Sequence, residues 1–129
     1  MPDAKILVVD DVETNLVLTV RMLTERGAWL LQQTRTAAGY RLYALAGGPP
    51  QRPGLVRDVR GTAIEVEVWA MPREQVGGFL ELIPAPLGLG KVELEDGRWV
   101  SGFICEPGAI EGAEEVTRWG GWRNYLAKG

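Results

Sequence analysis

Histidine is absent from this chain of 129 residues, cysteine occurs once, and no long apolar run is present. Without histidine the usual zinc ligand sets cannot be assembled, and the commonest general base and all Ser-His or Cys-His nucleophiles are lost. The single Cys105 cannot form an internal disulfide. The longest apolar run, around Ile6 to Val9, is far below the roughly 20 residues that span a bilayer, and no signal-peptide pattern precedes it. We therefore expect a cytoplasmic protein with no metal, no other cofactor and no membrane partner.

The composition is that of an ordinary globular domain. Hydrophobic residues make up 46% and charged residues 24% of the chain, which excludes collagen-like and disordered sequences. The length is near the commonest size of one domain and too short for two cores. A single domain over residues 1–129 is expected.

Charge is unevenly distributed along the chain, whose net charge is −3. The segment from Gln33 to Gly61 is basic, and the segment from Glu81 to Glu115 is acidic. A solvated face would produce this pattern, and an anion-binding patch is the sharper alternative. A nucleic-acid partner is not expected, because such proteins usually carry a basic excess over the whole domain and a recognisable motif.

Several short segments have the composition of strands. Residues 62–71 alternate between apolar residues on one face and Glu65, Glu67 and Trp69 on the other, which predicts a half-buried strand. Asp96-Gly97 is a strong hairpin signal between two further strands. The predicted strands are Lys5 to Val9, Ala28 to Thr34, Tyr40 to Leu45, Leu55 to Val59, Thr62 to Met71, Lys91 to Glu95 and Arg98 to Glu106.

Few helices are predicted. One begins near Thr14 and ends at Gly27, and a shorter one runs from Pro72 to about Leu82, weakened by Gly77-Gly78. The aromatic stretch at residues 119–125 should dock on the strands, because each ring can bury about 150–250 Å². Short strands, few helices and short connections predict a compact, barrel-like α+β domain.

Five runs of residues support a family resemblance: RTAAGYRLYAL, RPGLVRD, IEVEVWAMP, IPAPLGLGKVELEDGRWVSGFICEP and GGWRNYL. In order and spacing, over residues 34–127, they resemble the C-terminal domain of allophanate hydrolases. The resemblance implies a γ-glutamylcyclotransferase-like fold, which is a small twisted β-barrel with flanking helices and a ligand cavity at one end. In that family the domain follows an amidase domain and is implicated in oligomer assembly and in decarboxylating the N-carboxycarbamate intermediate of allophanate breakdown.

The first 27 residues resemble something else. The run KILVVDDVETNLVLTVRMLTERG is similar to the first strand and helix of a response-regulator receiver, including the paired acids Asp10 and Asp11. The surroundings of Pro53 and Lys91 lack the phosphoacceptor and lysine motifs of a receiver, so phosphotransfer is not expected. The receiver-like segment, natural or engineered, is expected to supply the strand and helix with which the allophanate domain also begins.

This replacement bears on chemistry. Allophanate hydrolase C-terminal domains tend to carry a Gly-Ala-His-type loop after the first strand, where this chain has Asp10 to Glu13. Acids in that place repel an anionic substrate. The carboxylate base of γ-glutamylcyclotransferases is also missing, since Pro-Ala-Pro-Leu-Gly occupies its place. Catalysis should be impaired, and whether the chain is an enzyme stays open.

Seven residues are candidates for binding a small carboxylate at the barrel mouth: Asp11, Arg41, Tyr43, Trp69, Pro86, Gly88 and Lys91. Arg41 offers a planar, bidentate fork, and Lys91 offers a point charge beside the Pro/Gly loop. Surface ion pairing is the alternative for Arg41, and plain exposure is the alternative for Lys91. Glu65 and Glu67 are either a paired-carboxylate site, solvent-facing side chains or partners of arginines.

Two functions are consistent with these features. In the first, the chain binds or processes a small carboxylate of the N-carboxycarbamate type in urea and allophanate degradation. In the second, it is a catalytically silent assembly module, with exposed aromatics such as Trp69 or Trp99 contacting an amidase partner or a second copy in a homodimer.

Overall fold

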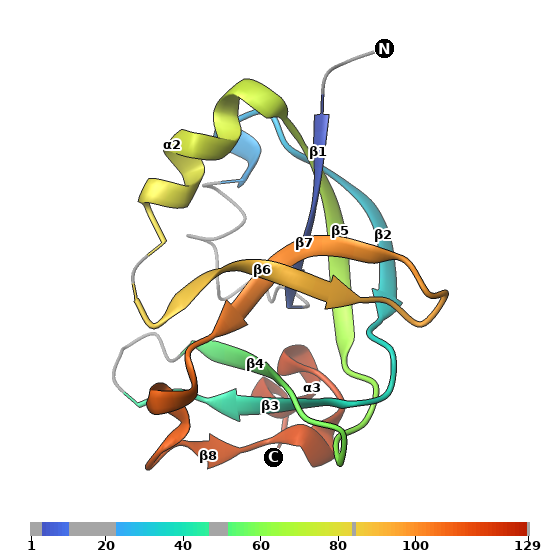
Figure 1. Ribbon diagram of the computed structural model, residues 1–129, viewed down its shortest axis with the longest axis vertical. Coiled ribbons are helices and arrows are strands. Elements are labelled where there is room, and N and C mark those ends of the chain that lie inside the picture. Colours follow the sequence, from blue (N-terminus) through green and yellow to red (C-terminus); the bar gives the residue numbers. More distant parts are fainter. Residues whose placement is uncertain (1–3, 11–22, 47–51, 84, 129) are drawn as a thin grey trace.

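The structure is a computed structural model that describes residues 4–10, 23–46, 52–83 and 85–128, and for residues 4–10 the backbone only. It consists of two β-sheets and a few short helices (Figure 1). The five-stranded sheet has the order β2-β5-β1-β7-β6, and the three-stranded sheet has the order β4-β3-β8. The strands are β1 (Ala4–Asp10), β2 (Trp29–Arg35), β3 (Tyr40–Ala44), β4 (Pro53–Arg57), β5 (Glu65–Pro72), β6 (Leu87–Glu93), β7 (Trp99–Cys105) and β8 (Glu114–Glu115). All seven predicted strands are confirmed, with shifted ends, whereas β8 was not predicted.

The five-stranded sheet is mixed. Strand β5 pairs antiparallel with both β1 and β2, and β6 pairs antiparallel with β7. Strands β1 and β7 are parallel and pair only at Leu7↔Ser101 and Val8↔Gly102. The receiver-like strand therefore lies in the middle of this sheet.

The closed barrel that the sequence predicted is wrong, whereas the α+β class is confirmed. The edge strands β2 and β6 meet only in an isolated bridge, Thr36↔Leu94, in the part of the chain that the structure describes. Two backbone hydrogen bonds flank it, from Ala37 N to Glu93 O (2.9 Å) and from Glu95 N to Arg35 O (3.0 Å). The sheet stays open because the chain leaves β2 after Arg35 and turns at Gly39, whose φ of 110° favours glycine, into the second sheet.

The helices are short. They are η2 (Arg73–Gln75), α2 (Val76–Glu81), η3 (Pro107–Ile110), η4 (Thr117–Trp119) and α3 (Trp122–Leu126). The predicted helix after Pro72 is confirmed as η2 and α2. Most of the predicted helix from Thr14 lies outside the described residues, but residues 23–25 are helical and Gly27, with φ of 79°, follows them. None of the described helices has the length and apolar character needed to span a membrane.

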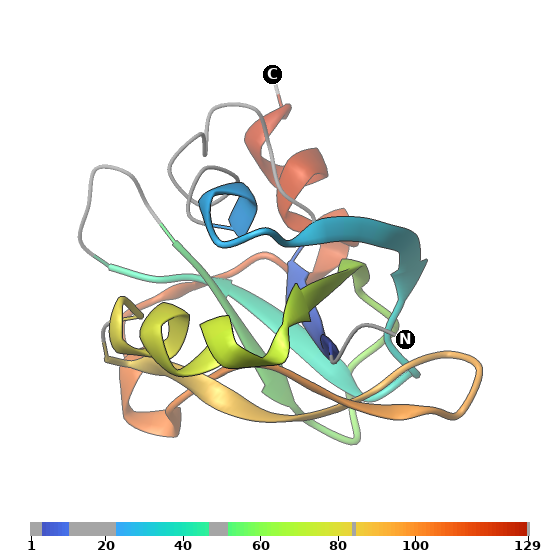
Figure 2. The same cartoon turned by 90° about the horizontal axis from the view of Figure 1, so that it is seen from above.

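The buried side chains form two clusters. The large core cluster lies mainly between the two sheets and α3, and comprises Tyr40, Leu42, Ala44, Leu55, Ile64, Val66, Val68, Val92, Leu94, Val116, Trp122 and Tyr125. The small core cluster lies beneath α2 and comprises Leu23, Ala28, Trp69, Met71 and Phe79. Helices α2 and α3 lie toward opposite ends of the long axis in Figure 1, and the view from above in Figure 2 also shows them apart. The docking predicted for the C-terminal aromatic stretch is confirmed, since Trp122 is fully buried and its ring lies 5.1 Å from that of Tyr125.

Strand β5 connects the two clusters. It contributes Val66 and Val68 to the large cluster and Trp69 and Met71 to the small one. The half-buried strand predicted for this segment is wrong, because the face that carries Trp69 is also covered and Glu67 is only 4% exposed.

Candidate functional site

A buried carboxylate marks one face of β5. Glu67 accepts three hydrogen bonds: from Trp69 Nε1 (3.0 Å), from Gln33 Nε2 (3.3 Å) and from a terminal guanidinium nitrogen of Arg123 (3.2 Å). Buried glutamate is rare unless it is paired. These donors come from β5, β2 and α3, so the carboxylate ties three elements together. Of the two roles considered for Glu67, the arginine-paired one is observed.

A pocket of about 270 Å³ opens next to this carboxylate. Its lining comes from β2, the start of β5, the β6–β7 turn and α3, and consists of Gln33, Thr34, Arg35, Glu65, Val66, Glu95 and Arg123. Because the ladder pairs Gln33 with Glu67 and Arg35 with Glu65, these four side chains lie on one face of the sheet. The pocket therefore lies beside two neighbouring carboxylates of β5, which face a neutral amide, Gln33, and one guanidinium, Arg35, on β2.

Short contacts hold the walls of the pocket. Glu65 N donates to Gly120 O (2.7 Å), which fixes the segment before α3 against β5. Thr34 donates its hydroxyl hydrogen to Glu95 Oε2 (3.2 Å), and an Arg98 guanidinium nitrogen donates to Gln32 Oε1 (3.0 Å). The β6–β7 turn is thereby fixed against β2. Gly120 has a φ of 80°, a left-handed conformation that suits glycine.

The charged side chains that line the pocket differ in whether they have a partner of opposite charge. Arg123 is paired with Glu67, whereas the Arg35 side chain has no ion pair or hydrogen bond to any part of the described chain. Glu65 accepts from the amide of Asn124 (3.3 Å) and Glu95 from the hydroxyl of Thr34, so both carboxylates have neutral donors. An ionic ligand would find both an unused cation and incompletely neutralised anions here.

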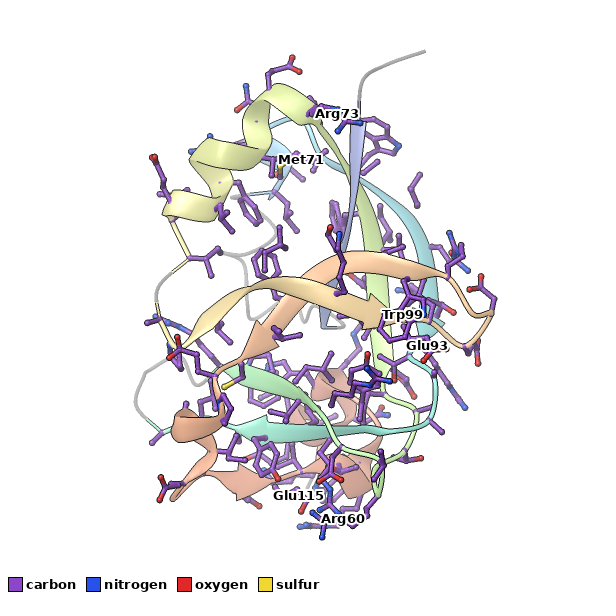
Figure 3. The ribbon with its side chains drawn as sticks, viewed as in Figure 1. Arg60, Met71, Arg73, Glu93, Trp99 and Glu115 are labelled. Carbon is purple, nitrogen blue, oxygen red and sulfur yellow. The ribbon has the colours of Figure 1, made fainter. Side chains whose placement is uncertain are left out.

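Arg41 and Tyr43, two of the predicted ligand contacts, lie on β3 in the other sheet. Arg41 forms ion pairs with Glu115 (2.8 Å) and with Asp58 (3.0 Å). The hydrogen bonds from the side chain and backbone of Arg60 are the main cause that lowers the pKa of Asp58 below its ordinary value. Figure 3 shows Arg60 and Glu115 close together at the end of the molecule away from α2. This cluster has the form of a surface ion-pair network.

Trp69 and Lys91 lie on the five-stranded sheet. Leu7 is in register with both Trp69 and Ser101, and Ser101 is in register with Lys91, so one row crosses four strands. The Lys91 ammonium donates to Ser101 Oγ (3.0 Å). At strand spacings of about 4.8 Å, the backbones of β5 and β6 at Trp69 and Lys91 are roughly 14 Å apart.

The remaining predicted ligand contacts lie at the start of β6 or outside the residues that the structure describes. Pro86 follows a cis peptide bond and precedes β6, and Gly88 lies within β6 with open space where a Cβ would be. Asp11 lies outside the described residues. The structure thus separates Arg41 and Tyr43 from the other candidates, and the role of all seven residues as ligand contacts stays a prediction.

Apart from Glu65, sequence reasoning missed the residues that line the pocket. Arg35 and Arg123 are 88 positions apart in the chain, and only the β2–β5 register and the docking of α3 bring them together. Polar residues at alternate positions, Gln33 and Arg35 in one segment and Glu65 and Glu67 in the other, could have indicated a shared polar face. That inference would have required knowing that the two segments pair. Among the described residues no cluster of three or more acidic or cysteine side chains is placed to hold a metal ion.

Comparisons with known proteins identify the family. Residues 5–127 match the allophanate hydrolase C-terminal domain. The urea amidolyase of Saccharomyces cerevisiae is 43% identical over 109 residues, which are 81% of this chain and 6% of that protein. Kluyveromyces lactis allophanate hydrolase matches in structure with a TM-score of 0.89 and 36% identity, over 96% of this chain and 21% of that one.

A third similar protein has nearly the same length. The crystal structure of a uropathogenic E. coli-specific protein matches with a TM-score of 0.83 and 30% identity, over 98% of both chains. The curated relatives are far longer, since this chain spans only 6% of their length. The family match covers the receiver-like β1 as well as the segments from β2 to α3. The chain belongs to the allophanate hydrolase C-terminal domain family.

Proposed function

We propose that this chain serves urea or allophanate breakdown as an assembly domain that docks on an amidase-type enzyme. The similar proteins include a urea amidolyase and an allophanate hydrolase, in which the matching region is a small share of a larger chain. Histidine, the commonest general base, is absent from the sequence. A binding role that requires no proton transfer is therefore favoured over a catalytic one.

The observation that carries this proposal is an apolar stretch on the edge strand β2. Trp29, Leu30 and Leu31 follow one another and are 42%, 44% and 49% exposed. Edge strands are usually protected by charged residues or proline, and here the first charged side chain is Arg35 at the far end of the strand. Figure 1 shows β2 along the outer side of the sheet, with β5 as its neighbour.

The position of this apolar stretch suits a protein partner. A register shift between Leu30 and Gln32 bends the strand there, and such bulges interrupt edge-to-edge pairing. We therefore expect side-chain packing against an apolar patch of the amidase-type enzyme, with backbone pairing as a lesser contribution. Trp99, 49% exposed on β7, is a second aromatic available for contact, whereas Trp69 is buried.

Sedimentation velocity tests the proposal. Kluyveromyces lactis allophanate hydrolase lacking its matching C-terminal region is titrated with this chain and with a Trp29→Ser, Leu31→Ser double variant. The unaltered chain is expected to form a complex, and the double variant should bind at least about tenfold more weakly because apolar contact area is lost.

The matched control is Val59→Ser. Val59 is 92% exposed and lies outside β2, so this variant loses an exposed apolar side chain without altering the proposed surface. Equal binding by the control and the unaltered chain is expected. A double variant that binds as tightly as the control, or a chain that forms no complex, rejects the assembly role.

A second candidate function is binding or decarboxylation of a small N-carboxycarbamate-type carboxylate at the sequence-predicted residues. It is favoured by Lys91, an exposed cation that adjoins the buried Ser101 hydroxyl on the same sheet face as Trp69. Calorimetry with malonate as the probe tests it. Heat of binding that Lys91→Gln abolishes supports this candidate, and malonate binding unchanged in that variant rejects the role of Lys91.

A further inference from the structure

The pocket between β2, β5, the β6–β7 turn and α3 has a charge pattern that neither proposed function uses. Its four charged lining residues are two arginines and two glutamates. One arginine, Arg123, is already paired with the buried Glu67. The charges left for a ligand are therefore one guanidinium, Arg35, and two carboxylates, Glu65 and Glu95.

Arg35 and Glu65 are direct cross-strand neighbours and yet do not pair. They occupy opposite positions in the β2–β5 ladder, where Cβ atoms are about 4.5–5.5 Å apart. Opposite charges at that spacing usually interact, but Arg35 forms no ion pair with any described residue, and Glu65 accepts instead from Asn124 Nδ2 at 3.3 Å. Both charged residues thus line the pocket without an ion pair between them.

Backbone hydrogen bonds fix the residues that carry these charges. Glu95 N donates to Arg35 O (3.0 Å), which fixes the turn residue beside Arg35, while Glu65 N donates to Gly120 O (2.7 Å) on the opposite side. Asn124 also donates to Trp119 O (3.0 Å), so its amide is held near the carboxylate of Glu65. The backbone segments that carry Arg35, Glu65 and Glu95 are therefore fixed to one another around the pocket.

We propose that this pocket binds a small zwitterionic amino acid. The ligand carboxylate accepts hydrogen bonds from the Arg35 guanidinium, whose planar fork suits bidentate binding. The ligand ammonium faces the carboxylates of Glu65 and Glu95, and Gln33 and Thr34 add polar contacts from β2. A volume of about 270 Å³ admits a small amino acid and is below the usual range for drug-sized ligands.

Charge balance distinguishes this ligand class from a simple anion. With Glu67 included, the site holds three carboxylates and two guanidinium groups. A simple carboxylate would gain one ion pair with Arg35 while approaching two glutamates, which repel it. A simple amine would leave Arg35 without a partner. A ligand that carries both charges complements Arg35 and the two glutamates together.

Isothermal titration calorimetry on the whole chain tests the proposal with glycine and β-alanine as zwitterionic probes, and acetate and ethylamine as probes with a single charge. At least one zwitterion is expected to bind with a Kd on the order of 1 mM, and both single-charge probes at least about tenfold more weakly. Arg35→Gln and Glu65→Gln should each weaken zwitterion binding by about tenfold or more.

Arg52→Gln is the matched control, since Arg52 is exposed and lies outside the pocket lining. It removes the same charge and should leave binding unchanged, and circular dichroism verifies that all variants fold. Acetate binding as tight as that of glycine would mean a simple anion site and overturn the proposal. Absence of binding by both zwitterions, or unchanged affinity in Arg35→Gln, also overturns it.

Discussion

The large and small core clusters differ in how they are closed. Two sheets and α3 enclose the large cluster, and it contains the fully buried Trp122, Tyr40 and Leu42. Beneath α2, a helix of six residues, the small cluster has five buried members. In Figure 3, Met71 of the small cluster lies beside α2, at the end of the molecule opposite Glu115. One strand, β5, thus contributes to two packing regions of unequal size.

We expect the small cluster to be the less stable one because of the helix that covers it. Helix α2 contains Gly77 and Gly78, and neither end has a side-chain cap. Isolated helices of this length are unstable, so α2 depends on packing. Its contribution comes mainly from Phe79, whose ring lies edge-on to Phe103 with centroids 5.7 Å apart. We therefore expect the small cluster to open without unfolding of the large one.

The largest effect is expected for Trp122→Ala. Removing this fully buried ring leaves a cavity in the large cluster and should lower the free energy of unfolding by about 3–5 kcal/mol. Urea denaturation monitored by circular dichroism measures it. A loss below about 1 kcal/mol would show that α3 is not part of the main core.

Phe79→Ala should cost somewhat less, about 3 kcal/mol at most. The substitution removes the side chain through which α2 mainly packs on the small cluster, and this side chain is only 1% exposed. Hydrogen exchange should show faster exchange over residues 76–81 with little change in β3 and β4. Uniform acceleration over the whole chain would instead mean that the two clusters unfold as one unit.

Thr36→Val tests a polar contact at the junction of β2 and β5. Thr36 is fully buried, and its Oγ1 accepts from Ile64 N at 3.0 Å. Valine keeps the shape but leaves that N–H without an acceptor, so a loss of about 1–3 kcal/mol in unfolding free energy is expected. Thr34→Val, at a less buried site, is the control, and equal losses in both variants would contradict the reasoning.

Gly77→Ala should raise the stability of the small cluster instead of lowering it. A Cβ at position 77 meets nothing within 4 Å, so alanine should stabilise α2 by about 0.5–1 kcal/mol. Gly61→Ala is the contrasting variant, because its Cβ would clash with the Tyr40 backbone. Thermal unfolding distinguishes the two, and destabilisation by both would show that α2 is not limited by its glycines.

The smallest effect is a pH dependence at the outer side of the second sheet. Arg60 hydrogen bonds lower the pKa of Asp58 below its ordinary 3.8. Because the folded pKa is lowered, the stabilisation is present above pH 3.8 and is lost as the pH falls through the folded pKa. Asp58→Asn should therefore flatten the acid side of the stability profile measured by urea titration. An identical acid profile in that variant would contradict this contribution.

Much of the fold could be predicted from local patterns. Alternation predicted β5, Asp96-Gly97 predicted the β6–β7 hairpin, and Gly97 has the positive φ of 92° that its turn requires. The open sheet could not be predicted, because closure depends on whether β2 and β6 form a ladder, and no local pattern reports that. Burial of both faces of β5 was missed because it depends on α2 as well as on the second sheet.

The candidate site was less predictable. Arg41 was selected for its guanidinium, but it forms ion pairs with Asp58, which follows the neighbouring strand β4, and with Glu115 from a distant part of the chain. Arg35 was not selected, although it is the arginine in the pocket without a partner among the described residues. Charge type can be read from sequence. Which charge is left unsatisfied depends on strand register and helix docking.

The central position of β1 has a consequence for synthesis on the ribosome. This strand is made before all other described strands, yet its two neighbours in the sheet are β5 and β7, completed only at residues 72 and 105. Until then its backbone hydrogen-bonding groups have no sheet partner. Contacts between such distant segments slow folding, so the nascent chain should need protection of its first strand until most of the domain has left the exit tunnel.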